Sequence, residues 1–368
     1  MAKDILILGG GVIGLATAFE CQNRGHQVTI LEIATCGGQA SGAAAGMLAP
    51  YSEMSEEPDD FFLLSHQSLK EYPEWQQEIK NKSSMDFEYV ESGSLYTIFH
   101  EAERFPLQTR MEWQNQFGVE ASIIEKSELK EMEPALSEEI LAALYTPSES
   151  HLYSPDYVKA LKQACLNTGV QIYEHLKHVE VIGWKNEVHL RSYEDKHFFA
   201  DHLIICNGAW SKELENSFGI AIPVFPIRGQ ICSYRTESLI KSLVFSSQGY
   251  VVSKGNGSLV CGASEDIAGF NVDVTEKGIK RLERWSKKLL PVLETMETNH
   301  KWAGLRPATQ DGFPLIGQLS NYNHVQFATG HYRNGILLSP ITAKVVADQI
   351  DGLKERVPLR SFSPERFS

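Results

Sequence analysis

The chain has 368 residues, of which 42% are hydrophobic, and 34 basic against 47 acidic side chains give it a formal net charge of −13. This length exceeds what one hydrophobic core usually needs and favours two domains. The acidic balance argues against a nucleic-acid partner, and no run of 18 apolar residues predicts a membrane span, so we expect neither partner.

The first predicted elements lie in "ILILGGGVIGLATAFE", which begins at Ile5. A short apolar run is typical of a buried parallel strand, and the helix expected at 12–23 follows it after a turn that contains Gly9, Gly11 and Gly14. Glycine permits a tight turn and a close approach of backbone to a pyrophosphate, and the helix N-terminus offers unpaired N–H groups to it. The pattern favours a dinucleotide site, although an ordinary glycine-rich turn would look similar.

A second strand, "QVTILE", ends on Glu32, 18 residues after Gly14. A carboxylate at this place can accept a hydrogen bond from a ribose 2′-hydroxyl, and it would repel a 2′-phosphate. The pair of strands therefore favours FAD or NAD over NADP.

The next part of the chain alternates small-residue, helical and strand-like segments. "CGGQASGAAAGMLAP" is a run of small residues, and helices are expected at 60–80 and 101–116, with strands at 86–90 and 93–99. A further helix is predicted with Ser154 as N-cap, Pro155 at its first position and Gly169 as its C-terminal stop.

The second half repeats the strand-to-glycine pattern and ends on a helix. Strands are expected at 178–182, 188–193 and 202–206, a β-rich part at 225–260, a helix at 275–290, a strand near Trp302 and a last helix at 334–350. We therefore expect an α/β fold in which a Rossmann-like FAD-binding domain (1–85, 146–222 and 300–368) is interleaved with a smaller α+β substrate domain on an antiparallel sheet (86–145 and 223–299).

Six ordered motifs extend across nearly the whole chain: "GGGVIGLATAF", "SGAAAGMLAP", "NGAWS", "PIRGQI", "WAGLRPATQDGFPLIG" and "ATGHYRNGILLSP". In these the sequence resembles the D-amino-acid oxidase superfamily of FAD-dependent amine oxidases, and within it the glycine oxidases of thiamin biosynthesis. The resemblance implies bound FAD. Relatives with covalent FAD use a cysteine in the C-terminal part, and none follows Cys261 here, so we expect non-covalent FAD.

The predicted cofactor site combines the glycine turn with three later segments. Small residues let backbone lie close to a flavin ring, although a tight packing turn would look the same. By resemblance, Val179 holds the adenine through its backbone, and the helix near Asn334 directs its positive N-terminal end at the flavin. The expected cofactor-binding residues are Gly9, Gly11, Val12, Ile13, Gly14, Glu32, Ser41, Ala43, Ala44, Ala45, Gly46, Met47, Val179, Asn207, Gly208, Trp210, His331, Tyr332, Arg333, Asn334, Gly335, Ile336 and Leu337.

The predicted substrate site rests on two arginines and a tyrosine. Arg306 in "GLRPATQDG" has the side chain that can clamp a carboxylate by two parallel hydrogen bonds, although an isolated arginine is more often a surface charge. The resemblance implies that Arg306, Tyr250 and Arg333 form the catalytic group. Gln248, Glu265 and Met47 are expected in the substrate pocket, where Gln248 replaces a histidine and Glu265 a methionine of the relatives.

The resemblance implies oxidation of glycine, sarcosine and D-alanine by O2, with an imine, ammonia and hydrogen peroxide as products. It also implies a homo-oligomer, with a tetramer among the options. Scattered cysteines without a C-x-x-C pair indicate a cytoplasmic protein. We expect no metal, because His175 and His178 lie in a strand-like stretch and have no cysteine or carboxylate partner at the spacing of metal ligands. A D-amino-acid dehydrogenase, a sarcosine oxidase and, more remotely, a flavoprotein that modifies a tRNA base remain alternatives.

Overall fold

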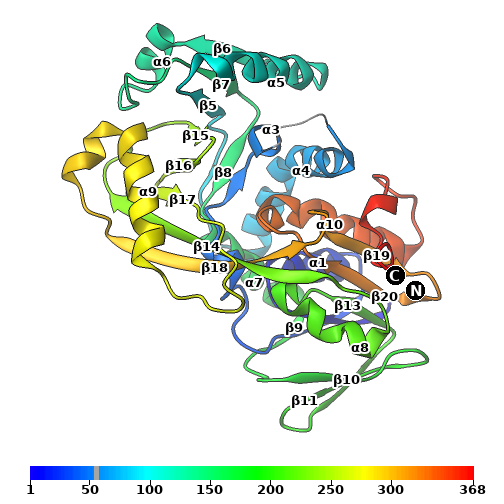
Figure 1. Cartoon of the computed structure of the whole chain (residues 1–368). Helices are drawn as coiled ribbons and strands as arrows, with labels where there is room; N and C mark the ends of the chain where they lie inside the picture. Colours follow the sequence, from blue (N-terminus) through cyan, green and yellow to red (C-terminus); the bar gives the residue numbers. More distant parts are fainter. Residues whose placement is uncertain (54–57) are drawn as a thin grey trace.

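The computed structural model describes residues 1–53 and 58–368 and contains two large sheets, two small ones and the helices around them (Figure 1). The first large sheet has six strands in the order β19-β20-β13-β1-β2-β9, and every neighbouring pair is parallel except β19 with β20. Its strands are β1 (Asp4–Leu8), β2 (Gln27–Leu31), β9 (Gln171–Tyr173), β13 (His202–Ile205), β19 (Leu315–Leu319) and β20 (Tyr322–Thr329).

Both faces of this sheet are covered, which explains why β1 is apolar without alternation. Ile5 and Ile7 point into the core that the helices share, whereas Leu6 and Leu8 point into a second core on the opposite face. The first face carries α1 (Val12–Asn23), α4 (Asp60–Ser83), α7 (Ser154–Thr168) and α10 (Gly335–Asp351). The second carries the small antiparallel sheet of β10 (Val179–Gly183), β11 (Val188–Ser192) and β12 (His197–Ala200).

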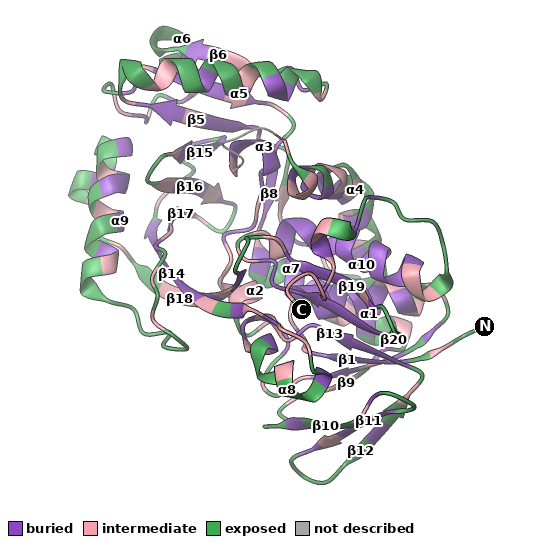
Figure 2. Ribbon diagram, turned by 45° about the vertical axis from the view of Figure 1, so that its right-hand side comes forward, coloured by how far each residue is buried: buried purple, intermediate pink, exposed green. Residues whose placement is uncertain are grey.

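The helix α1 lies between the sheet and its neighbours, with contacts to α7 and α10. Apolar residues surround it on nearly all sides, as is typical of a central helix, and Figure 2 shows α1 and α10 largely buried. Its bounds are those predicted, and α10 begins directly after the predicted Asn334.

The second large sheet has eight strands in the order β18-β14-β17-β16-β15-β5-β7-β6, all antiparallel except the pair β15 and β5. These are β5 (Ser94–Ile98), β6 (Ser122–Glu125), β7 (Ala142–Thr146), β14 (Val224–Arg235), β15 (Leu243–Ser246), β16 (Gly249–Lys254), β17 (Ser258–Gly262) and β18 (His300–Thr309). The amphipathic helix α9 (Glu276–Leu289) packs on it through Ile279, Leu282 and Trp285, and its other side is exposed (Figure 2).

The remaining elements are short or lie at the edges of the two sheets. They are α2 (Ala40–Ala43), β3 (Met47–Leu48), α3 (Pro50–Glu53), β4 (Tyr89–Val90), η1 (Glu101–Glu103), α5 (Arg104–Gln116), α6 (Lys126–Met132), β8 (Ser150–Leu152), η2 (Gly208–Leu214), α8 (Glu215–Phe218), η3 (Pro291–Thr295) and η4 (Arg360–Phe362). The helices and strands expected from the sequence are present, and the mixed α/β fold is confirmed.

Two local predictions need correction. Ser154 is the first residue of α7, and the N-cap is Tyr153, which makes no side-chain cap. The Ser154 hydroxyl is buried and has no hydrogen-bond partner among the described residues, so it cannot serve the helix end. His175 and His178 lie in the loop between β9 and β10 rather than in a strand, and His175 has a positive φ of 60°.

The predicted domain boundaries stay predictions. The strand β18, which we placed in the FAD-binding segment that starts at residue 300, pairs along its whole length with β14 in the eight-stranded sheet. All six cysteines are free and buried. None of the helices in the described part of the chain combines the length and apolar character that crossing a bilayer requires.

Candidate active site

The three glycines of the pattern at the start of α1 serve two different purposes. Gly9 has a φ of +108°, and a Cβ there would lie 2.4 Å from the carbonyl oxygen of Cys206. A Cβ on Gly14 would lie 2.0 Å from the carbonyl oxygen of Gly9. These two glycines therefore let the turn and helix pack closely, as the dinucleotide-binding pattern requires.

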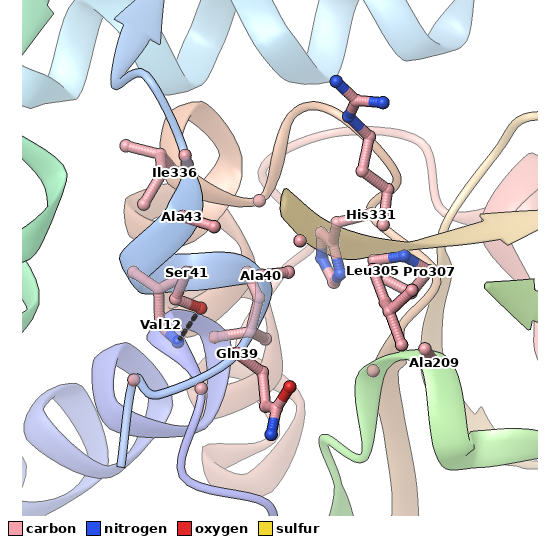
Figure 3. Close-up of a pocket in the computed structure, with 18 of the residues that line it drawn as sticks. Val12, Gln39, Ala40, Ser41, Ala43, Ala209, Leu305, Pro307, His331 and Ile336 are labelled. Atoms are coloured by element: carbon pink, nitrogen blue, oxygen red, sulfur yellow. Dashed lines mark hydrogen bonds between the residues drawn. The ribbon is translucent and has the colours of Figure 1, made fainter. Parts of the chain in front are cut away.

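Gly11 is different, because a Cβ there would meet only the Ser41 hydroxyl, at 3.4 Å, and would point into a cavity. This space at the N-terminus of α1 suits a pyrophosphate that approaches the backbone. The Ser41 Oγ accepts a hydrogen bond from the Val12 N–H at 2.9 Å, and Figure 3 shows this bond between two residues that line the cavity.

Glu32 directly follows β2, and its carboxylate contacts the turn between β1 and α1. One of its carboxylate oxygens accepts the Gly10 N–H at 2.7 Å, and the other accepts the Ala34 N–H at 2.8 Å. The carboxylate thus faces the cavity in a fixed orientation, and its remaining lone pairs are available for ribose hydroxyls.

The small residues of α2 are packed between α7 and strand β18 of the eight-stranded sheet. The Trp302 indole N–H donates to the Ala43 carbonyl at 2.9 Å, and a Cβ on Gly304 would lie 2.8 Å from the Cβ of Ala43. The segment therefore packs tightly against β18 and also lines the cavity, and its contact with a flavin ring stays a prediction.

The N-terminus of α10 closes the opposite side of the cavity. Its N-cap residue, Asn334, makes no side-chain cap in the described structure, and Gly335 and Ile336 line the cavity. The preceding Tyr332 has a φ of +47°, an uncommon conformation for a residue with a side chain. His331 lines the cavity (Figure 3). Its burial lowers its pKa to about 3, so the imidazole is neutral.

Three features of the cavity fit bound FAD. Gly11 leaves room at a helix N-terminus, and the uncapped N-terminus of α10 offers a second positive dipole end. The side-chain oxygen of Asn207 is buried at the cavity with no partner among the residues that the structure describes. Such an atom requires a donor, which hydroxyl groups of a nucleotide supply.

Arg306 and Tyr250 lie at one end of this cavity. Arg306 donates from Nη1 to the carbonyl oxygen of Ser264 at 2.8 Å, and its guanidinium lies directly over Gly229. The Tyr250 hydroxyl lies over Gly262, where a Cβ would be 2.3 Å away. Burial raises the pKa of Tyr250 to about 12 although the charge of Arg306 opposes this, so its hydroxyl is a hydrogen-bond donor.

Arg333 lies between two carboxylates. Its Nη2 is 3.5 Å from Glu53 Oε1, and its Nη1 donates to Glu265 Oε1 at 3.3 Å. Glu53 and, less strongly, Glu265 raise the pKa of the guanidinium above its usual value. The charge of Arg333 is therefore balanced within the site, whereas Arg306 is bound to a neutral carbonyl.

A second cavity of about 620 Å³ adjoins the first and contains Gln248 and Glu265 in its wall. Both side chains are exposed, so they lie at its rim rather than at its base. Four residues line both cavities: Glu53, Tyr250, Arg306 and Arg333. Three of these were expected from the sequence.

Most of the other expected residues line the first cavity. They are Gly9, Gly11, Val12, Ile13, Glu32, Ser41, Ala43, Ala44, Ala45, Gly46, Met47, Asn207, Gly208, Trp210, His331, Tyr332, Gly335 and Ile336. Within the described chain its lining does not include Gly14, Val179, Asn334 or Leu337. Val179 begins β10 and packs in the core on the opposite face of the sheet, and its contact with adenine stays a prediction.

The sequence did not identify Glu53 or Gly229. Glu53 follows the small-residue run within a few positions, and proximity to that run was the one available signal. Gly229 lies in "PIRGQI", a motif that carried the resemblance but to which no role was given.

The chain is similar to known proteins over almost its whole length. The family model described as FAD dependent oxidoreductase matches residues 4–349. The glycine oxidase of Geobacillus kaustophilus is 34% identical over 366 residues, which are 99% of this chain and 97% of that protein. Its crystal structure superposes with a TM-score of 0.94 at 33% identity and covers 99% of both chains.

A further relative is longer than this chain. The bifunctional protein ThiO/ThiG of Synechocystis is 31% identical over 372 residues, which cover 99% of this chain and 54% of that protein. The similarity therefore concerns about half of the bifunctional protein.

Proposed function

The chain belongs to the DAO family of FAD dependent oxidoreductases, and from this premise we propose that it oxidises glycine and other small amines such as sarcosine and D-alanine. The observation that carries the proposal is the group of Arg306, Tyr250 and Arg333 at the junction of the two cavities. Similarity to the glycine oxidase of G. kaustophilus over the full length supports the choice of substrate.

Arg306 and Tyr250 bind the substrate carboxylate. A guanidinium donates two parallel hydrogen bonds to a carboxylate, and the protonated phenol of Tyr250 adds a third donor. FAD, when bound, would supply the two-electron acceptor for a hydride from the substrate carbon, and O2 would serve as the final electron acceptor. The two residues orient the substrate for this reaction, which contributes to the rate through positioning rather than through acid or base chemistry at the carbon.

The N-terminus of α10 and the turn after β1 provide the electrostatic environment. The N-terminal ends of α1 and α10 favour negative charge on groups that lie against them. Glu32 orients the ribose, and the small residues of α2 leave space beside Ala43 and Met47. We expect FAD to be held without a covalent bond, so that acid precipitation releases it intact.

The overall reaction converts an amine and O2 into an imine and hydrogen peroxide, and water then converts the imine into a 2-oxo acid and ammonia, or methylamine when the substrate is sarcosine. We propose further that the imine formed from glycine supplies the thiazole of thiamin, that the protein works in the cytoplasm, and that it forms a homo-oligomer such as a tetramer. The ThiO/ThiG relative supports the link to thiamin.

The proposal is tested by measuring hydrogen peroxide from the purified, FAD-loaded protein with glycine, sarcosine, D-alanine and a bulky D-amino acid. We expect peroxide from the three small amines. Peroxide from the bulky D-amino acid alone would contradict the assignment, and flavin reduction without peroxide in air would favour a dehydrogenase.

A further inference from the structure

Glu53 is the one carboxylate among the four residues that line both cavities in the described structure. The other three are the cations and the phenol that the proposed function assigns to the carboxylate end of the substrate. An amino acid carries an ammonium group on the carbon next to its carboxylate. A negative side chain at this junction is therefore placed to meet the second charge of the same small molecule.

Glu53 differs from Glu265, the other acidic residue in the wall of the second cavity. The side chain of Glu53 is 12% exposed, against 50% for Glu265. Glu265 accepts a hydrogen bond from Arg333, whereas in the described residues no hydrogen bond reaches the carboxylate of Glu53, whose ion pair with Arg333 spans 3.5 Å. Glu53 thus has free lone pairs in a poorly solvated place, where an ion pair with a ligand is strong.

The turn that carries Glu53 is fixed from behind. The buried carboxylate of Glu149 accepts the N–H groups of Tyr51 and Ser52 at 2.7 and 2.8 Å and the Ser52 hydroxyl at 2.6 Å. Arg110 donates to the Ser52 carbonyl at 2.8 Å. These bonds hold α3 so that its last residue faces the junction of the cavities, which is the support that a binding residue requires.

We propose that Glu53 is the counter-ion of the substrate ammonium group and determines specificity for amino acids over other small carboxylates. This inference rests on the proposed function. The carboxylate of the substrate meets Arg306 and Tyr250, and its ammonium group donates hydrogen bonds to Glu53. Because oxidation needs the neutral amine, the ion pair also sets the pH at which the bound amine loses its proton, and that proton leaves through the second cavity to water.

The test compares glycine with glycolate, which has the same carboxylate but a hydroxyl in place of the ammonium group. Kd for glycine and the limiting rate come from the rate of anaerobic flavin reduction at increasing glycine concentration, and Kd for glycolate comes from the change in flavin absorbance. The variants are Glu53→Gln, the charge-retaining Glu53→Asp and, as a matched control, Glu71→Gln, which changes a carboxylate on α4 that is 10% exposed and is not part of the described lining of either cavity.

For Glu53→Gln we expect Kd for glycine to rise about 10- to 100-fold at neutral pH, as for the loss of hydrogen bonds to a charged group, while Kd for glycolate stays within about threefold or falls. The acid limb of the limiting rate should move to lower pH, because removal of the anion eases loss of the amine proton. Glu53→Asp should recover part of the affinity for glycine, and Glu71→Gln, which lies outside the site, should change this affinity less than about threefold.

The outcomes separate the possible errors. If Glu53→Gln raises Kd for glycine and Kd for glycolate by the same factor, Glu53 only positions Arg333 and the inference is wrong. If neither Kd changes while FAD content and the melting temperature are those of the wild type, Glu53 has no part in binding. If glycine does not reduce the wild-type flavin at all, the proposed function fails and this inference fails with it.

Discussion

The guanidinium of Arg306 lies face-on against Gly229 of the neighbouring strand. An ideal Cβ on this glycine would lie 2.3 Å from Cζ of Arg306 and 2.4 Å from both Nη1 and Nη2. In the register of β14 and β18, Ile227 is opposite Arg306 and Gly304 is opposite Gly229, so the two residues are diagonal neighbours. The strand therefore needs a glycine at this place for the arginine to adopt its position.

Gly229→Ala should accordingly displace Arg306 without removing it. We expect KM for glycine to rise about 10- to 100-fold, because displacement of a group that positions the substrate can weaken binding and slow the reaction by about this factor. Steady-state kinetics and FAD content check the prediction. Gly183→Ala is the matched control, since its Cβ would meet only ordinary contacts at 3.5 and 3.9 Å. Equal KM values in the two variants would show that Arg306 does not depend on Gly229.

Arg306→Ala removes the proposed carboxylate clamp itself. Loss of an ion pair that ground and transition states share should raise KM for glycine about 10- to 1,000-fold, which corresponds to about 1.5–4 kcal/mol, with a smaller change in kcat. Arg306→Lys keeps the charge but not the two parallel hydrogen bonds, so its KM for glycine should lie between those of the wild type and Arg306→Ala. An unchanged KM in Arg306→Ala, with normal flavin absorbance, would place the clamp elsewhere.

Glu32→Ala should weaken cofactor binding rather than substrate binding. The variant loses charge-assisted bonds to the ribose and leaves the N–H groups of Gly10 and Ala34 without their acceptor, so Kd for FAD should rise about 10- to 100-fold. Fluorescence titration of the protein without flavin measures this Kd. Glu180→Ala, which removes an exposed carboxylate from β10, is the control. The same Kd in both variants would mean that Glu32 does not contact the cofactor.

Lys254 predicts a specific dependence of stability on pH. Its ammonium group is buried, and it donates to the Leu152 carbonyl at 2.8 Å and lies 3.2 Å from Nδ1 of His151. Burial lowers the pKa of Lys254 from 10.5 to about 7. Between these values the unfolded chain binds the proton and the folded chain does not, so this residue adds stability as the pH rises from about 7 to about 10, by at most about 1.4 kcal/mol per unit.

Lys254→Met should remove this slope. Denaturant unfolding at several pH values between 7 and 10 gives the free energy of unfolding, and the wild type should gain stability relative to the variant as the pH rises. Lys126→Met, which changes an exposed lysine on α6, should keep the slope of the wild type. Parallel curves for the wild type and Lys254→Met would show that Lys254 stays charged in the folded protein.

The sequence was most informative where function depends on a local pattern. The bounds of α1, the glycine turn before it and the start of α10 follow from apolar spacing and glycine positions, and the structure has them where they were expected. The resemblance, carried by motifs distributed along the chain, also led to Arg306, Tyr250 and Arg333, which the structure brings together at the junction of two cavities.

The residues that sequence reasoning missed depend on contacts between distant segments. Gly229 is required because Arg306, 77 positions later, lies over it, and only the register of β14 and β18 reveals this. Glu53 looks like one of several acidic residues after α2, and its low exposure comes from packing against Arg333 and the turn held by Glu149. Serine is common at helix N-caps, which is why the sequence predicts this role for Ser154, but its hydroxyl is buried and makes no hydrogen bond among the described residues.

The central claim is that glycine reduces the bound flavin of this protein, and anaerobic titration of the FAD-loaded wild type with glycine tests it most directly. We predict that the absorbance of the oxidised flavin is lost on addition of glycine without air, and that air restores it with formation of hydrogen peroxide. A flavin that stays oxidised with glycine, sarcosine and D-alanine, but is bleached by a bulky D-amino acid, would contradict the account.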